Sequence, residues 1–169
     1  MVEKATNSPR LLHEFFERTA RRFPDQVAVD VPPGFGRPAR STLTYAQLHA
    51  QAESLAARLR ALREVVQPDG VVGIMLPRSS SDLYVAQLAV LRSGAAFTCL
   101  DPVFPDAHIA SVLADGDVGV LISDAQGMKR AAMAGCAVPH QIDISKVLQN
   151  EASPARADIT SPTSFPVPS

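Results

Sequence analysis

Hydrophobic residues recur every three or four positions between residues 11 and 23, which is the spacing of one face of an α-helix. This pattern predicts an amphipathic helix that ends before Pro24. Residues 27–31 follow as a short apolar run that favours a strand. A second helical pattern runs over 44–62, with leucine and alanine on one stripe and polar residues off it. That stripe predicts a surface helix covering one side of a sheet.

The start of the second helix carries a complete capping signal. Thr44 can act as the N-cap, and Gln47, three residues later, can bond back to the Thr44 amide. Leu43 and Leu48 can pack across the first turn as a hydrophobic staple. We therefore expect the helix to begin at Thr44.

Apolar runs and helical patterns alternate through the rest of the chain. Three runs suit strands buried on both faces: 71–76, 95–100 and 118–122. Helical patterns follow them at 81–92, 106–114 and 125–134, and a last strand is expected within 138–144. This order predicts right-handed crossovers and an α/β fold with a parallel β-sheet flanked by helices.

Local signals mark the joints of these units. The serines of 78–82 can cap the helix that follows them. Gly94 stands where a glycine in the left-handed conformation ends a helix. Asp101-Pro102 leads the chain out of the sheet, and Pro105-Asp106 is a favourable helix opening.

Length and composition set the domain organisation. A chain of 169 residues can bury one core, and 46% hydrophobic with 20% charged residues is typical of a globular domain. We expect a flexible N-terminus over 1–10, a folded unit over 11–145, and a disordered tail rich in Pro, Ser and Thr over 146–169.

Charge and hydropathy limit the classes of partner that the sequence favours. A net charge of −1 gives no electrostatic reason to expect nucleic acid or an anionic membrane surface. No apolar run approaches the roughly 20 residues that cross a bilayer, and no signal peptide is evident. We therefore expect a cytoplasmic protein.

The isolated residues that could belong to a functional site fit structural roles better. The glycines of 32–40 lack a third glycine and a following helix, so we expect an exposed turn rather than a phosphate loop. Cys99 and Cys136 have no CxxC partner, which favours two buried thiols over a disulfide or a zinc site. Asp101 is expected to serve its joint, and a solvated turn is expected around Gly116. The scattered histidines are interpreted as surface or packing residues: His13, His49, His108 and His140.

Three segments in order resemble adenylate-forming enzymes, and within them the adenylation domains of nonribosomal peptide synthetases. LTYAQL (43–48) resembles the first core motif, usually Leu-Thr/Ser-Tyr-x-Glu-Leu. VLRSGAAFTCLDP (90–102) resembles the second, usually Leu-Lys-Ala-Gly-x-Ala-Tyr-x-Pro-Leu-Asp-Pro. The opening helix resembles the family's usual start, and the resemblance covers about residues 11–125. Gln47 stands in place of Glu, Phe97 in place of Tyr, and Cys99 in place of Pro, which restores a backbone donor.

The resemblance implies a chemistry in which ATP, with Mg²⁺, activates a carboxylic or amino acid as an acyl-adenylate. The acyl group then passes to a thiol of a carrier protein or of coenzyme A. In the family the phosphate loop and the catalytic lysine lie downstream of the two motifs. Residues 159–169 hold hydroxyl groups but neither Gly nor Lys, and Lys129 is expected on a helix surface. We therefore expect no catalytic, cofactor-binding or metal-binding residue, and no cofactor, for this chain by itself.

Two hypotheses about function follow. In the first, the chain is a truncated N-terminal piece of an adenylation domain, inactive alone, whose partner is the remainder of a synthetase or another subunit. In the second, it is a non-enzymatic interaction module that docks onto a larger synthetase. A complete small enzyme is disfavoured, because no convergent set of polar groups is evident.

Overall fold

A computed structural model describes residues 11–34, 39–62, 66, 70–136 and 138–151. The segment 1–10, the middle of the glycine-containing turn (35–38) and the last residues, 152–169, lie outside this described part. The expectations of a flexible N-terminus and a disordered tail, and the comparison of 159–169 with a phosphate loop, therefore remain predictions.

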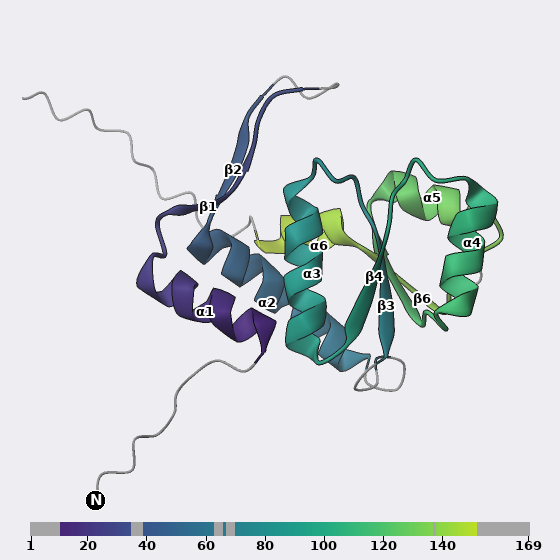
Figure 1. Ribbon diagram of the computed structural model, residues 1–169, viewed down its shortest axis with the longest axis horizontal. Helices are drawn as coiled ribbons and strands as arrows, with labels where there is room; N and C mark the ends of the chain where they lie inside the picture. The colour runs from purple at the N-terminus through teal and green to yellow at the C-terminus, as the bar shows by residue number, and fades with distance from the viewer. Residues whose placement is uncertain (1–10, 35–38, 63–65, 67–69, 137, 152–169) are drawn as a thin grey trace, which may run out of the picture.

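The first part of the chain forms two helices joined by a hairpin (Figure 1). Helix α1 (Leu12–Arg22) leads into β1 (Val27–Val31), which pairs antiparallel with β2 (Ser41–Thr44). Helix α2 (Tyr45–Ala61) starts directly after β2. Elements α1, β1 and α2 match the expectations from the sequence, whereas a strand over residues 41–44 was not expected.

The second part is a four-stranded sheet in the order β4-β3-β5-β6. Its strands are β3 (Val71–Met75), β4 (Ala96–Leu100), β5 (Val120–Ser123) and β6 (His140–Asp143). The helices are α3 (Ser81–Ser93), α4 (Asp106–Asp115), α5 (Ala125–Met133) and α6 (Ile144–Glu151). All three strand pairs are parallel, which confirms the expected α/β fold.

Helices cover both faces of the sheet (Figure 1). On one face, α2, α3 and α6 enclose a core with side chains from β3, β5 and β6, among them Leu55, Ile74 and Val90. On the other face, α4 and α5 enclose a smaller core that includes Met75, Ile109 and Leu121. Strands β3 and β5 therefore lie buried on both faces, as their unbroken apolar runs predicted.

The capping box of α2 and both end signals of α3 are confirmed. The Gln47 amide donates to Thr44 Oγ1 at 3.2 Å, and the Thr44 amide donates to Gln47 Oε1 at 2.9 Å, which completes the capping box. The Ser80 side chain caps α3, and Gly94 ends it with φ 85°. Each of these signals acts within a few residues, so the sequence alone could reveal it.

Two expectations about the sheet and its end are wrong. Strand β4 was expected to be buried on both faces, but it lies at the edge of the sheet, and Ala96 and Cys99 are exposed. The tail was expected to begin at 146, but helix α6 continues to Glu151 because it buries Ile144 and Val147 against the larger core. No helix in the described part of the chain is long and apolar enough to cross a membrane.

Candidate functional site

The carboxyl edge of a parallel sheet is the usual place for a ligand, at the point where the strand order reverses. Here β4 and β5 lie on opposite sides of β3, so the reversal falls between β3 and β5. One arginine and three acids lie where the strands end or just beyond: Arg78, Asp101, Asp124 and Asp143. These four side chains are the natural candidates for binding or chemistry.

The Asp101 carboxylate bonds to groups in nearby loops at this edge. Its Oδ1 accepts the Val103 amide at 3.1 Å, and its Oδ2 lies 3.0 Å from Nε of Arg78. The Arg78 side chain is 80% exposed, so the ion pair lies at the surface and holds Asp101 only weakly. The expectation that Asp101 serves the joint after β4 is confirmed.

The other two acids cap helices. Asp124 Oδ1 accepts the Gly127 amide at 2.7 Å, and Asp143 Oδ1 accepts the Ser145 amide at 3.1 Å. Lys146 Nζ lies 3.8 Å from Asp143 Oδ2. Both carboxylates thus satisfy amides at the first turn of a helix, where a negative charge is stabilised.

Asp82 is the titratable group at this edge whose surroundings clearly shift its pKa upward. Burial raises the pKa of Asp82 above its usual range, hydrogen bonds from Ser80 and Ser81 lower it in part, and the Asp124 carboxylate raises it further. The side chain lies beside a hollow of about 290 Å³ between the start of α3 and the β1–β2 hairpin. The described residues that line this hollow add serine hydroxyls and apolar groups, but no histidine, lysine or second carboxylate that could act as a base.

The described part of the chain offers no converging set of ligands for Mg²⁺ or a triphosphate. No group of three His, Cys, Asp or Glu side chains in it could hold a metal ion. His49 stacks on Phe16 with ring centroids 6.3 Å apart, and His108 meets Phe104 edge-on at 5.0 Å, so both have packing roles. The wider expectation that the chain carries no site residue stays a prediction.

The other candidate side chains lie at the surface or are partly buried. Lys129 is exposed on α5, and Asp115 and Asp117 are exposed on either side of Gly116, as expected. The expectation of two buried thiols is wrong, because Cys99 is exposed on the edge strand and Cys136 is half-buried; both are free. Burial and, secondarily, the nearby Asp106 charge raise the pKa of the Cys136 thiol, which therefore stays protonated at neutral pH.

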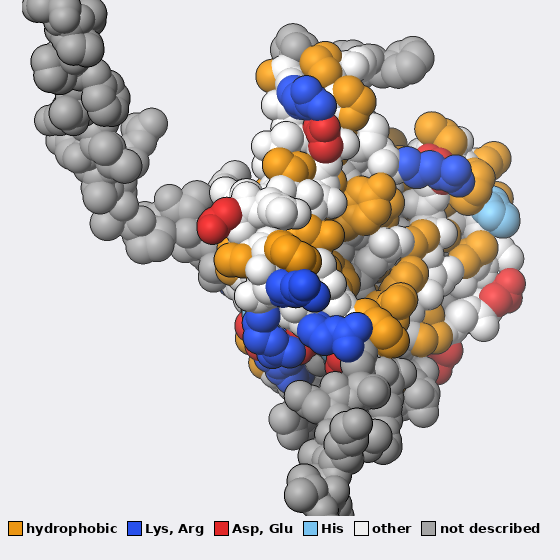
Figure 2. Space-filling model, turned by 60° about the vertical axis from the view of Figure 1, so that its left-hand side comes forward, with side chains coloured by type: hydrophobic (Ala, Val, Ile, Leu, Met, Phe, Trp, Pro, Cys, Tyr) orange, Lys and Arg blue, Asp and Glu red, His pale blue; other side chains and the backbone are white. Residues whose placement is uncertain are grey.

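An apolar groove of about 670 Å³ opens on the surface of the described part of the chain. It runs between α1, β1, the start of α2, α3 and β4, and four aromatic side chains line it: Phe16, Tyr45, Tyr84 and Phe97. Figure 2 shows hydrophobic side chains gathered across the face that includes this region. The lining of the groove is mainly apolar, which is typical of a binding surface.

This groove was not predicted from the sequence. Its walls come from five elements spread between Leu12 and Phe97, so it forms only when the chain folds. The available signal was the number of large apolar side chains at the start of α1, of which Leu12 and Phe16 line the groove. Leu12 is 71% exposed in the structure, and exposed apolar surface of this kind is typical of interfaces.

Comparison with protein families gives a match to AMP-binding enzymes over residues 16–168. The synthetase AmbB, which makes an antimetabolite in Pseudomonas aeruginosa, is 38% identical over 132 residues, covering 78% of this chain and 10% of AmbB. Syringomycin synthase SyrB1 of Pseudomonas syringae is 32% identical over 154 residues, covering 91% of this chain and 24% of SyrB1. The chain thus spans at most about a quarter of the length of these two relatives.

Solved structures agree with the sequence matches. The N-terminal subdomain of Klebsiella oxytoca NpsA, in complex with anthranilyl-AMSN, superposes with a TM-score of 0.63 at 26% identity, covering 83% of this chain and 32% of that one. A longer NpsA chain, in complex with 3-hydroxyanthranilyl-AMSN, gives a TM-score of 0.66 at 24% identity, covering 85% and 26%. The sheet order, the two motifs and these matches point the same way: the chain belongs to the AMP-binding enzyme family and corresponds to the N-terminal part of an adenylation domain.

Proposed function

We propose that this chain is the N-terminal scaffold of an adenylation domain. The intact domain would use ATP and Mg²⁺ to activate a carboxylic or amino acid as an acyl-adenylate, and would pass the acyl group to a thiol of a carrier protein or of coenzyme A. The part of the chain described here would position the rest of the domain and would hold no reacting group.

The observation that carries this proposal is the use of the acids at the carboxyl edge of the sheet. Asp101, Asp124 and Asp143 each bond to a backbone amide of their own loop or helix. A carboxylate committed in this way helps to hold the fold and is a poor ligand for a metal ion. Phosphoryl chemistry needs positioned charge around the triphosphate, and this region does not supply it.

The first experiment measures pyrophosphate exchange into ATP by the purified chain, with Mg²⁺ and a panel of amino acids. We expect no acid-dependent exchange above the no-protein control, while a complete adenylation domain assayed in parallel gives a clear signal. Acid-dependent exchange that follows the chain through purification would contradict the proposal.

A second experiment tests the scaffold role directly. Residues 11–151 replace the matching segment of SyrB1, and the chimera is assayed with the same panel. If this segment supplies only scaffold, the chimera keeps the acid preference of unaltered SyrB1. A folded chimera, judged by a melt as sharp as that of SyrB1, whose preferred acid changes would show that the segment helps to select the acid.

The apolar groove favours a second candidate, an interaction module that docks onto a larger synthetase without catalysing a reaction. In that case the chain binds a purified adenylation-domain synthetase, and Tyr84→Asp abolishes binding because it places a charge in the groove. Gln126→Ala, on the exposed surface of α5, serves as the control. Binding that survives Tyr84→Asp would exclude the groove as the docking surface.

A further inference from the structure

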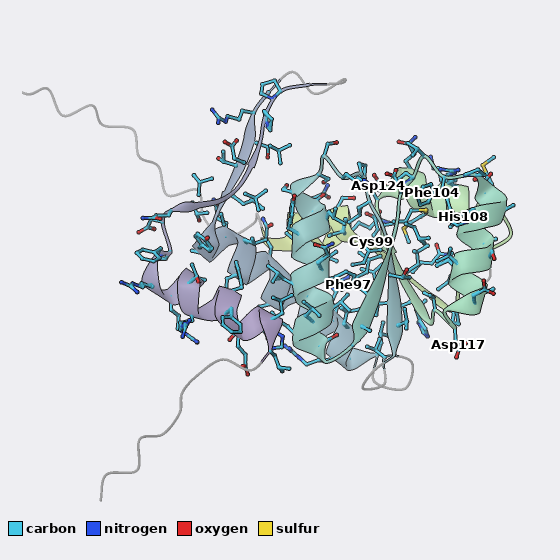
Figure 3. The ribbon with its side chains drawn as sticks, in the orientation of Figure 1. Phe97, Cys99, Phe104, His108, Asp117 and Asp124 are labelled. Carbon is cyan, nitrogen blue, oxygen red and sulfur yellow. The ribbon has the colours of Figure 1, made fainter. Side chains whose placement is uncertain are left out.

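Strand β4 presents an unpaired edge whose hydrogen-bonding groups can be assigned. The Ala96 amide donates to the Gly70 carbonyl at 2.9 Å, so Ala96 faces β3. Because the direction of the backbone groups alternates along a strand, Thr98 and Leu100 also face β3. Phe97 and Cys99, whose side chains are labelled in Figure 3, therefore direct their backbone amides and carbonyls outward. These backbone groups have no partner in the part of the chain that the structure describes.

Position 99 decides whether this edge can accept another strand. The motif that this segment resembles usually has proline there, and proline on an outward position removes a donor and blocks strand addition. In this chain Cys99 supplies the amide, and its side chain is held by Gln87, whose Nε2 lies 3.4 Å from Sγ. Both outward residues thus carry a complete donor and acceptor pair.

We propose that β4 pairs antiparallel with β4 of a second copy of this chain, about a two-fold axis at Thr98. This register places Phe97 opposite Cys99 of the second copy, and Cys99 opposite its Phe97. In an antiparallel ladder, residues opposed in this way exchange both of their hydrogen bonds. The pairing satisfies every outward group at positions 97 and 99 and joins the two four-stranded sheets into one.

The side chains are compatible with this register. Thr98 meets Thr98 of the second copy at the axis, and threonine pairs are favourable across strands. Each Phe97 ring lies beside a Cys99 sulfur, a favourable contact between a polarisable atom and an aromatic ring. Asp101 falls opposite Ala95, so no like charges oppose each other along β4. A net charge of −1 per copy adds little general repulsion.

Apolar surface beside β4 would add to the area that the paired strands bury. A specific dimer buries about 800 Å² on each partner, which a strand of five residues does not supply alone. A two-fold axis perpendicular to the sheet keeps α3 on the same face in both copies, so the two α3 helices approach each other. Tyr84 of α3 is 44% exposed, and Leu88 and Phe97 line the adjoining groove. An unrelated extended peptide lacks this symmetric match, which is why we favour a second copy.

Sedimentation of the chain in a thiol reductant, over a range of micromolar concentrations, tests the proposal with two variants. We expect the parent protein to dimerise and Cys99→Pro to weaken the dimer at least about tenfold, because two intermolecular hydrogen bonds are lost. Cys99→Ala, which keeps the amide and removes the thiol, should dimerise nearly as well. The bonds from β4 to β3 belong to positions 96, 98 and 100, so Cys99→Pro should keep the circular dichroism spectrum of the parent.

Hydrogen exchange of the parent protein provides an independent test, free of any effect of substitution on folding. The amides of Phe97 and Cys99 should become protected as the concentration rises, whereas the Thr98 amide, already bonded to β3, should not change. A chain that stays monomeric, including one that binds only other proteins, would overturn the proposal. So would a dimer that a folded Cys99→Pro variant retains at full strength, or one formed without protection at Phe97 and Cys99.

Discussion

The contact between Gly127 and Ser123 gives a sharp prediction about the packing of α5 on the sheet. A Cβ atom added at Gly127 would lie 2.0 Å from Ser123 Oγ and 3.2 Å from Met75 Cε. Ser123 is fully buried, and its Oγ donates a hydrogen bond to the Met75 carbonyl at 2.7 Å. The hydroxyl therefore cannot rotate away from an alanine at 127 without losing its buried partner.

Gly127→Ala should destabilise the fold by about 1–2 kcal/mol. Overpacking or the loss of the buried hydrogen bond costs about 1–3 kcal/mol, and the better helix propensity of alanine returns up to about 1 kcal/mol. Ser123→Ala alone should cost about 1 kcal/mol, the net worth of one hydrogen bond. In the double variant the hydroxyl is absent, so adding alanine at 127 should cost less than about 0.5 kcal/mol.

Urea unfolding of the parent, the two single variants and the double variant measures this coupling. We expect the double variant to be more stable than the sum of the single changes predicts by about 1–2 kcal/mol. Gln126→Ala, exposed one position earlier on the same helix, should change the unfolding free energy by less than about 0.5 kcal/mol. Additive effects, or a Gly127→Ala variant as stable as the parent, would show that α5 does not pack against Ser123 in this way.

Two further predictions concern α3. Gly94→Val should lower the unfolding free energy by about 1–2 kcal/mol because the φ angle of Gly94 is 85°, even though the space around it is open. Ser93→Ala should change the unfolding free energy little. Equal effects of the two substitutions in urea unfolding would contradict this prediction. Arg92 forms ion pairs with Glu17 of α1 and with Glu53 of α2, so Arg92→Gln should lower the unfolding free energy at pH 7. This loss of stability should shrink as the pH falls below about 4.3, where the carboxylates become protonated. A loss that is independent of pH would count against an electrostatic role.

The sign of the pH effect follows from the surroundings of Glu53. Burial alone would raise its pKa, but hydrogen bonds from Arg92 and Arg60 outweigh burial and hold the pKa below its usual range. A carboxylate whose pKa is lowered in the folded state contributes stability above its unfolded pKa and loses it as the pH falls. Glu53 is 41% exposed, so solvent screens the pair, and the effect should also decrease in salt.

The helices of this fold could be predicted because their signals are local. The box between Thr44 and Gln47 and the left-handed position of Gly94 each depend on neighbours within the same turn. Helix α6 carried a weaker signal of the same kind, since Ile144, Val147 and Leu148 have helical spacing after Asp143. The polar, proline-rich residues that follow obscured that signal. Strand β2 carried none, because residues 41–44 become a strand only through their pairing with β1.

The groove and the edge strand depend instead on which elements become neighbours. The run 95–100 is as apolar as the run 118–122, and both fit a strand between two helices. The order β4-β3-β5-β6 gives β5 a neighbour on each side and leaves β4 with one. That order results from the directions in which the crossovers leave β3 and β4, which the composition of a strand does not encode. The replacement of proline by Cys99 was visible in the sequence as a restored amide. That amide matters for strand pairing only because β4 lies at the edge of the sheet. There the Cys99 amide points away from β3 and is available to another strand.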